Sequence, residues 1–474
     1  MKKILTIELV GILILSGFGA YAIPIRNPSI QQSSKLNEYD MVIIAPEFFS
    51  ESLQKLIEHK NSVGIRTFLK HVEEIYDEYQ GYDDAEQIKY FIKDAIESYG
   101  IEYVLLVGGR KGQSLKWYIP VRYTNNKYHV ADSDFYHKKF ISDLYFADIY
   151  KQNDEFEDWD SDSDGIFAEW TDDGRPDDSL DLIPDVYLGR LPCRYKNEVS
   201  IIVDKIIRYE NTVYGQEWLN DILLVGGDSF PGIGEPFPYE GEVSCEWILN
   251  YLEGFNPTRL YCSYGTLTGS NDFISAFNKG NGFVLYHGHG KQNSLHTYHP
   301  DSRDVINVFN PNSLNRIHNE DRLPVMVVGC CLTTDFDVGI LNFLNILKNY
   351  NKYVNFFDFI EGCVSECLGW NMVKKSDGGS IAYIGGTSTG YLVPGDNNHD
   401  DIPDVAQMGY TTGLCDEFFR VYGIDGKRIL GEIYCDTLAS IIKNQSAQTN
   451  RGQCKCVQEF LLIGDPSLKI GGYP

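Results

Sequence analysis

Two histidines and two cysteines follow apolar runs in the sequence and are the residues best suited to covalent chemistry. His289 stands between two glycines just after the apolar residues 283–286, and Cys330 and Cys331 directly follow the apolar residues 325–328. A thiol beside an imidazole can pass its proton to the ring and become a nucleophile. Because reactive groups in open α/β sheets collect beyond the carboxyl ends of strands, we expect the two segments to meet there.

The same residues also fit a purely structural role. Cysteine is among the most buried residue types, so Cys330 and Cys331 could lie in the core or in a disulfide. His287 and His289 would then only occupy a turn. The residues taken alone leave both interpretations open.

The elements that must position these side chains alternate between strand-like and helix-like patterns. Strands are expected at residues 41–45, 65–69, 102–108, 221–227, 259–262, 282–286, 323–328 and 379–384. Helices are expected at residues 53–59, 84–99, 197–209, 242–252, 271–279, 365–375, 412–421 and 427–443. Such alternation implies a parallel sheet covered by helices. We predict two side-by-side parallel-sheet α/β subdomains covered by helices, residues 39–214 and 215–474.

The composition predicts an exported, soluble protein. A chain of 474 residues that is 43% hydrophobic can bury a large core. Its formal charge of −26 opposes binding to nucleic acid or to an anionic membrane. Residues 1–22 have the pattern of a signal peptide, and residues 23–38 that of a linker or short pro-segment. We therefore predict a secreted or extracellular protein, with an uncleaved signal anchor as the alternative.

The cysteine count fits that compartment but does not fix the pairing. All 11 cysteines lie after the predicted signal peptide, where disulfides are permitted. An odd number leaves at least one thiol unpaired unless chains cross-link. No spacing among them predicts a metal–thiolate site.

Several motifs together resemble the gingipain family of cysteine peptidases. They are the segment around His289, Gly-Cys-Cys-Leu-Thr-Thr-Asp-Phe-Asp at 329–337, residues 379–385, and Ile-Gly-Asp-Pro-Ser-Leu at 463–468. They occur in the family's order and approximate spacing, and residues 185–191 add a match upstream. The resemblance implies a caspase-like fold and a secreted cysteine endopeptidase that acts on protein or peptide substrates.

The resemblance also implies roles for single residues. The family's general base falls on His289 and its nucleophile on Cys331, while the acid that orients the histidine falls on Asp228. Such a carboxylate fixes the tautomer of the ring, although Asp228 could instead cap a turn or helix. The N–H groups of Gly290 and Cys331 are the candidate oxyanion-hole donors.

Two acidic positions are candidates for substrate binding. Family positions that select arginine or lysine before the cleaved bond fall on Glu242 and at or next to Asp396. A carboxylate facing a guanidinium gives bidentate recognition, so a preference for basic residues is expected. The alternative for Glu242 is a favourable charge at a helix N-terminus.

One acidic loop resembles the first half of a calcium-binding loop. Its carboxylates alternate along the chain and a glycine, Gly165, stands at the turn. The expected ligands of a structural calcium ion are Asp158, Asp160, Asp162, Asp164 and Glu169. The pattern departs from an EF-hand because its position 12 is Thr171. Residues 396–401 are a second, poorer candidate, and no organic cofactor is expected.

Two other classes of protein remain alternatives. A non-catalytic surface or binding protein could use the same fold with Cys331 held in a disulfide. A transpeptidase would share the acyl-transfer chemistry but pass the acyl group to an amine.

Overall fold

The computed structural model describes residues 38–126, 139–232, 237–300, 302, 304–339, 364–445 and 447–474. Residues 38–474 form one compact unit. The predicted signal peptide and residues 23–37 of the predicted linker lie outside the described residues. Among the residues that are described, no helix combines the length and apolar character needed to cross a membrane.

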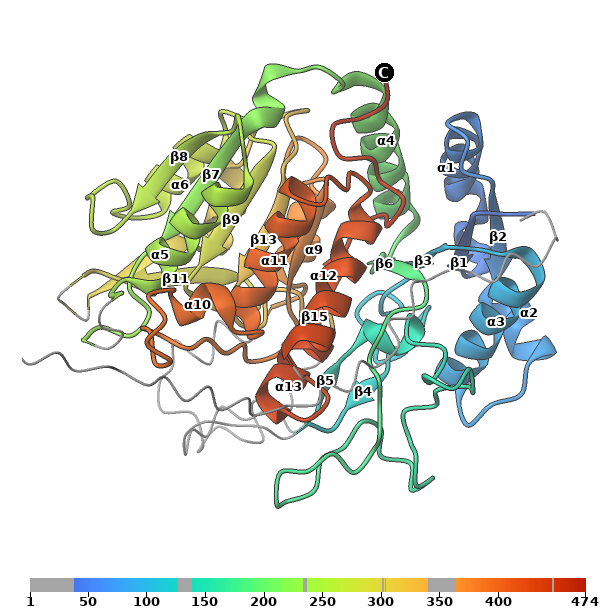
Figure 1. Ribbon diagram of the computed structural model, residues 1–474. Helices are drawn as coiled ribbons and strands as arrows, with labels where there is room; N and C mark the ends of the chain where they lie inside the picture. Colours follow the sequence, from blue (N-terminus) through green and yellow to red (C-terminus); the bar gives the residue numbers. More distant parts are fainter. Residues whose placement is uncertain are drawn as a thin grey trace, which may run out of the picture. The chain divides into compact units, whose positions relative to one another are not determined.

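A ten-stranded sheet forms the centre of the unit, in the order β2-β1-β3-β6-β15-β14-β13-β9-β7-β8 (Figure 1). Its strands are β1 Met41–Ala45, β2 Thr67–His71, β3 Tyr103–Val107, β6 Tyr187–Leu191, β7 Asp221–Gly226, β8 Asn256–Tyr261, β9 Phe283–His287, β13 Val325–Gly329, β14 Ala382–Gly386 and β15 Phe460–Ile463. Every residue of β1, β3, β9, β13 and β14 is buried, as expected for strands covered on both faces.

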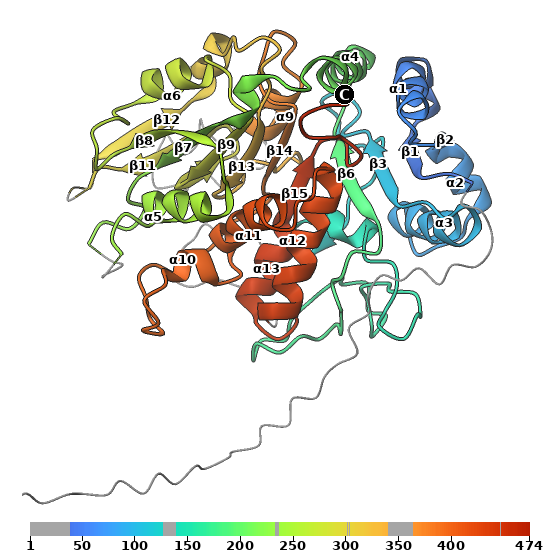
Figure 2. The same cartoon turned by 45° about the horizontal axis from the view of Figure 1, so that its top comes forward.

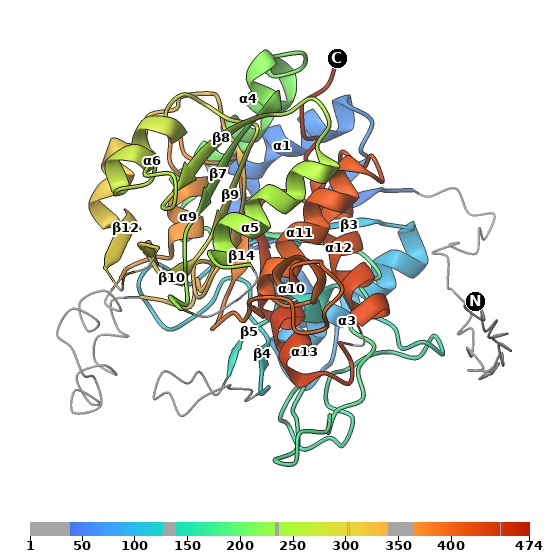
Figure 3. The same ribbon diagram turned by 60° about the vertical axis from the view of Figure 1, so that its left-hand side comes forward.

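Helices cover both faces of this sheet. They are α1 Ser50–Ser62, α2 Val72–Glu78, α3 Asp84–Tyr99, α4 Lys196–Thr212, α5 Glu240–Trp247, α6 Ser270–Phe277, α9 Leu368–Val373, α10 Asp404–Gln407, α11 Thr411–Gly423, α12 Leu430–Gln445 and α13 Arg451–Glu459. Figure 2 shows α1, α4, α6 and α9 on one face and α3, α5, α11 and α12 on the other. In Figure 3, α5, α11 and α12 lie side by side along that second face.

The α/β class predicted from the sequence is confirmed, and the two predicted layers are two halves of one continuous sheet. The strand β15 joins them, since it pairs with β14 and its Ile463 pairs with Arg190 of β6. The sheet is not wholly parallel, because β15 runs antiparallel to β14. Helix α13 leads straight into β15 at the carboxyl end of β14, where Phe460 pairs with Gly386. Because β15 starts beside the carboxyl end of β14, it must run antiparallel to β14.

Two small sheets were not predicted from the sequence. One consists of β10 His289–Lys291, β11 Ser294–Tyr298 and β12 Val305–Phe309, and all of its pairs are antiparallel. The other pairs β4 Tyr123–Thr124 with β5 Phe140–Ile141. The first matters for chemistry, because it begins at His289.

Candidate active site

The backbone around His289 is held by a sharp reversal after β9. The Tyr286 hydroxyl shares its one hydrogen between the carbonyls of His289 (2.8 Å) and His296 (2.7 Å), which are paired residues of β10 and β11. A Cβ on Gly288 would lie 2.5 Å from that hydroxyl oxygen, so only glycine allows this approach. The histidine therefore leaves the sheet on a fixed path.

The other histidine of the same motif, His287, is a core residue. It is fully buried in β9, and its Nε2 lies 3.0 Å from the Ser244 hydroxyl. Burial lowers the pKa of His287 to about 3, so this ring stays neutral at physiological pH. The structure thus separates the two histidines, with His287 packed inside and His289 at the end of the sheet.

The His289 ring has a defined tautomer. Its Nε2 lies 2.9 Å from the carbonyl oxygen of Ser229. Because a carbonyl only accepts hydrogen bonds, Nε2 carries the hydrogen and Nδ1 of the neutral ring keeps its lone pair. Burial lowers the pKa of His289, which leaves the ring in the neutral, proton-accepting form at pH 7.

Aromatic neighbours fix the plane of that ring. The ring of His296 stacks on it at 5.2 Å, and Phe230 and Tyr298 meet it edge-on at 5.7 and 5.5 Å. A ring enclosed in this way cannot turn freely. The lone pair on Nδ1 therefore keeps one direction.

The Cys330–Cys331 pair follows β13 at the end that lies beside His287. Strands β13 and β9 are parallel, with Gly329 paired to His287, so both segments leave the same edge of the sheet. A Cβ on Gly290 would lie 2.3 Å from the Cys330 sulfur and 2.5 Å from the Cys331 carbonyl oxygen. Gly290 is therefore in direct contact with Cys330 and Cys331, and the two segments meet at this edge as the sequence predicted.

The two cysteines differ in exposure and environment. Cys330 is buried and its thiol points toward the Thr333 hydroxyl, at 3.9 Å. Cys331 is partly exposed and its thiol points toward the carbonyl of Gly390, also at 3.9 Å. Ten cysteines are described and all are free thiols, and nine of them are buried. Cys363 lies outside the described residues, so Cys331 is the accessible thiol of the described part.

The Cys331 thiol is protonated in the resting protein. Removal from water raises its pKa to about 11, and the Glu459 carboxylate acts in the same direction. The contact with Gly390 and the charge of Lys455 partly oppose this shift. The thiol and the His289 imidazole are therefore both neutral, and a base must remove the thiol proton before the sulfur can attack.

Asp228 shapes the turn next to His289. Its carboxylate accepts the N–H of Phe230 (2.9 Å), and its carbonyl accepts the N–H of Tyr298 (3.0 Å) and the Thr297 hydroxyl (3.1 Å). These bonds present the carbonyl of the next residue, Ser229, to the histidine. The sequence placed the Asp228 carboxylate at the ring nitrogen, whereas the structure shows the Ser229 carbonyl there. A backbone carbonyl leaves no trace in residue types, so the sequence could not reveal it.

Glu242 lies in the wall of an open cavity of about 400 Å³. It stands in the first turn of α5 and accepts the N–H of Ser263 (2.9 Å) and the hydroxyl of the same serine. Burial raises the pKa of Glu242, and Asp228 adds to the shift. Aromatic rings of Trp247, Tyr261 and Tyr264 also line the cavity.

The second predicted substrate residue, Asp396, is not among the residues that line this cavity. Asp396 is buried and accepts the N–H groups of His399 (2.7 Å), Asp400 (3.3 Å) and Asp401 (3.0 Å). It therefore closes its own loop. Asp401, from the same loop, is the acidic residue that reaches the cavity wall beside Glu242.

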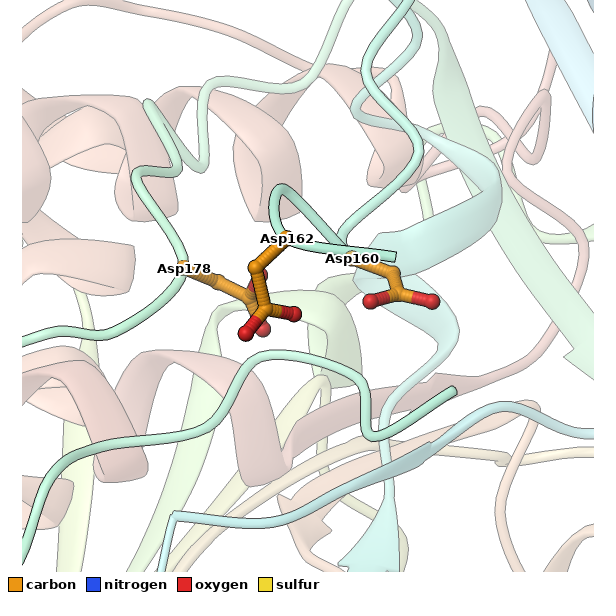
Figure 4. A group of neighbouring side chains, drawn as sticks. All are labelled: Asp160, Asp162 and Asp178. Atoms are coloured by element: carbon orange, nitrogen blue, oxygen red, sulfur yellow. The ribbon is translucent and has the colours of Figure 1, made fainter. Parts of the chain in front are cut away.

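The predicted calcium loop brings its carboxylates together. Oxygen atoms of Asp160, Asp162 and Asp178 lie within 4.8 Å of one another, and those of Asp162, Asp164 and Glu169 form a second such group. Figure 4 shows the carboxylates of the first group turned toward the same space. Asp178 was not predicted, because it reaches the loop from 14 residues beyond Asp164 in the chain.

Burial and the crowding of carboxylates raise the pKa of two residues in this region. Burial raises the pKa of Asp178 to about 6 and that of Glu169 to about 7, with neighbouring carboxylates adding to both shifts. The remaining predicted ligand, Asp158, lies outside both groups. Its carboxylate accepts the N–H of Asp160 (3.3 Å) and lies 4.0 Å from the Lys151 ammonium.

An α/β sheet that presents a histidine and a cysteine on adjoining strand ends is typical of cysteine-dependent hydrolases. A family model described as peptidase family C25 matches residues 34–471. The chain belongs to this family.

Curated relatives come from Porphyromonas gingivalis. Gingipain R2 of strain ATCC BAA-308 / W83 is 24% identical over 318 residues, which cover 66% of this chain and 34% of the relative. Lys-gingipain W83 is 22% identical over 215 residues, covering 44% of this chain and 10% of the relative. The matched part thus spans about a third or less of the length of these relatives.

Solved structures of related peptidases have the same fold. The crystal structure of the Arg-specific cysteine proteinase gingipain R aligns with a TM-score of 0.60 and 18% identity, covering 92% of this chain and 79% of that one. The complex of the RgpB pro- and mature domains from Porphyromonas gingivalis aligns with a TM-score of 0.59 and 18% identity, over 91% of this chain and 79% of that one. The caspase-like architecture implied by the sequence motifs is therefore confirmed at the level of the fold.

Proposed function

We propose that the protein is a cysteine endopeptidase in which Cys331 is the nucleophile and His289 the general base. The observation that carries the proposal is the contact of Gly290, the residue after His289, with Cys330 and Cys331 at one edge of the sheet, where Cys331 is the accessible thiol of the described part. Membership of family C25 supports the same assignment. A peptidyl thiol reagent that labels Cys331, and no buried cysteine, tests it.

The reaction begins with proton transfer from the Cys331 thiol to Nδ1 of His289. The Ser229 carbonyl holds the hydrogen on Nε2 and stabilises the imidazolium that forms. The sulfur attacks the peptide carbonyl, and the N–H groups of Gly290 and Cys331 are the proposed oxyanion donors. The imidazolium then gives its proton to the leaving amine. Water hydrolyses the acyl-enzyme and frees the thiol.

The cavity beside α5 is the proposed site for a basic side chain before the cleaved bond. Glu242 and Asp401 supply carboxylates and the three aromatic rings supply flat apolar walls, which suit the long stem and cationic head of arginine or lysine. The names of the two gingipain types describe relatives specific for such residues. Asp396 acts in this proposal by shaping the loop that carries Asp401.

Replacing Glu242 by glutamine should lower kcat/KM for substrates with arginine before the cleaved bond. Loss of one charge-assisted hydrogen bond costs about 1.5–3 kcal/mol, or roughly 10- to 150-fold. The kinetics of a matched pair of fluorogenic peptides, with arginine or norleucine at that position, measure the change. The norleucine peptide is the control and should be cleaved as before. An equal loss on both peptides would contradict a role in recognition.

We also propose that the acidic loop binds a structural calcium ion. Asp160, Asp162, Asp164 and Glu169 remain the proposed ligands, and Asp178 joins them. Carboxylates at such distances repel one another strongly unless a cation is bound, and calcium prefers several oxygen ligands of this kind. Residues 396–401 stay a second prediction for the same ion.

Calcium should raise the melting temperature of the wild-type protein, and Asp162→Asn should remove most of that gain. An ion that binds only the folded state stabilises it by about 2.7 kcal/mol at 100 times its Kd. Differential scanning calorimetry with calcium or with chelator measures the effect. Asp158→Asn is the matched control, because it removes the same charge from the same loop outside both groups. Identical behaviour of the two variants would rule out the proposed ligand set.

The predicted export of the protein is part of the same proposal. Residues 1–22 supply the signal pattern, and the relatives of the chain are peptidases. A secreted or extracellular location would give the enzyme access to protein and peptide substrates.

A further inference from the structure

A buried ion pair lies on α13, close behind the proposed nucleophile. Lys455 and Glu459 are one helical turn apart and almost completely buried, and the ammonium contacts the carboxylate Oε2. The same ammonium donates to the carbonyl of Thr389 (2.6 Å) and lies over the rings of Phe140 (4.8 Å) and Tyr391 (5.2 Å). The ammonium therefore lies among a carboxylate of α13, the carbonyl of Thr389 and two aromatic rings.

The segment that Lys455 contacts is also the one that contacts Cys331. Residues 387–391 follow the end of β14, and the Cys331 thiol points to the carbonyl of Gly390. The carbonyl of Ser388 accepts the N–H of Leu332 (2.9 Å). One short stretch of backbone thus has the cysteine loop on one side and the ion pair on the other.

The ion pair leaves one buried carboxylate oxygen without a hydrogen bond in the described part of the chain. This oxygen is Oε1 of Glu459. A Cβ on Gly386 would lie 3.7 Å from this oxygen and 3.1 Å from the Cys330 carbonyl. Both charges act on the neighbouring thiol, since Glu459 raises the pKa of Cys331 and Lys455 lowers it.

We propose that the Lys455–Glu459 pair positions the Cys331 loop and sets how readily the thiol reacts. This inference rests on the proposed role of Cys331 and adds two positioning residues to it. Burying two charges costs desolvation that their attraction often only balances, so stability alone does not account for the pair. The thiol proton still goes to His289, because the Glu459 carboxylate already accepts the Lys455 ammonium.

Other titratable groups lie around the ion pair and the cysteine loop and must be held constant. They are His289 on β10, Cys330 in the same loop, Cys415 on α11, Tyr391 in the contacted segment, and Cys456 on α13. Substitutions confined to Lys455 and Glu459 leave all of these in place.

The test is the pH dependence of alkylation of Cys331 by iodoacetamide in the full chain, read by peptide mapping. Glu459→Gln keeps the shape of the side chain and removes the negative charge. We expect its alkylation midpoint to fall by about one pH unit, which corresponds to about tenfold faster labelling below the midpoint. Lys455→Met should shift the midpoint upward, and Lys455→Arg should restore the wild-type value.

Opposite shifts from the two charge-removing variants separate this inference from loosened packing, which would move both midpoints in one direction. Unchanged midpoints in Glu459→Gln and Lys455→Met, or shifts of the same sign, would overturn it. Should Glu459→Gln fail to fold, the opposite-signed shift in Lys455→Met with rescue by Lys455→Arg decides the question. Labelling needs no substrate, so an inactive wild-type protein would refute the proposed peptidase function while the alkylation result still judges the ion pair.

Discussion

Replacing Cys331 by alanine is expected to abolish peptide hydrolysis, with a loss in kcat/KM on the order of 10⁴ or more. The sulfur forms the acyl intermediate, and no neighbouring side chain can replace it. The Cys330 thiol lies in the core and faces Thr333. The change should also remove covalent labelling by a peptidyl thiol reagent. Progress curves with a fluorogenic peptide and intact-mass spectrometry measure both losses.

Cys330→Ala is the matched control for this prediction. It deletes one thiol at the adjacent position and should retain most turnover and all labelling, with only a modest loss of stability from the buried sulfur. Full activity in Cys331→Ala, or equal inactivation of the two variants, would refute the assignment of the nucleophile. A protein whose thiol is inert but whose fold is intact would favour the non-catalytic alternative. Transfer of the acyl group to an added amine would favour the transpeptidase.

The sequence revealed the strands that carry the chemistry because those strands are buried on both faces. Residues 282–286 and 323–328 are continuous apolar runs, and they became β9 and β13 with shifts of at most two residues at each end. The cysteine and histidine motifs follow those runs directly, so their meeting at one sheet edge could be predicted.

The parts that the sequence did not reveal depend on contacts distant in the chain. The strand β15 is short and comes straight from α13, so local periodicity gave no sign of a strand that joins two halves of a sheet. Asp178 and the Ser229 carbonyl likewise reach their sites because loops bring distant parts of the chain together. Residue spacing predicts ligands that are near in sequence, as for Asp160 and Asp162, and is silent about those that are not.

The resting site holds a neutral pair rather than an ion pair. Burial lowers the pKa of His289 and raises that of the Cys331 thiol to about 11, so neither group is charged at pH 7. A preformed thiolate would react with any electrophile. A neutral thiol reacts when a substrate occupies the site and His289 takes the proton, which makes the histidine as necessary as the sulfur.

Replacing His289 by alanine should therefore lower kcat/KM by about 10²- to 10⁴-fold, the range that a general base contributes. Added imidazole should restore part of the activity, since it can fill the space between Phe230, His296 and Tyr298 and accept the proton. Rescue by imidazole would distinguish lost chemistry from lost structure. His318→Ala, at an exposed position paired with Asp377, is the control and should keep wild-type activity.

The pH profile of the wild-type enzyme supplies the second measurement for the same residue. Proton acceptance requires the unprotonated ring, so kcat/KM should fall as the pH drops through the lowered pKa of His289, with an acidic midpoint below 6.5. The thiol pKa of about 11 places no further ionisation of Cys331 near neutral pH, so the profile should be level above the acidic limb. An acidic midpoint above 6.5 would show that the histidine works as an imidazolium paired with a thiolate. Such a pair would require the substrate or another group to stabilise both charges.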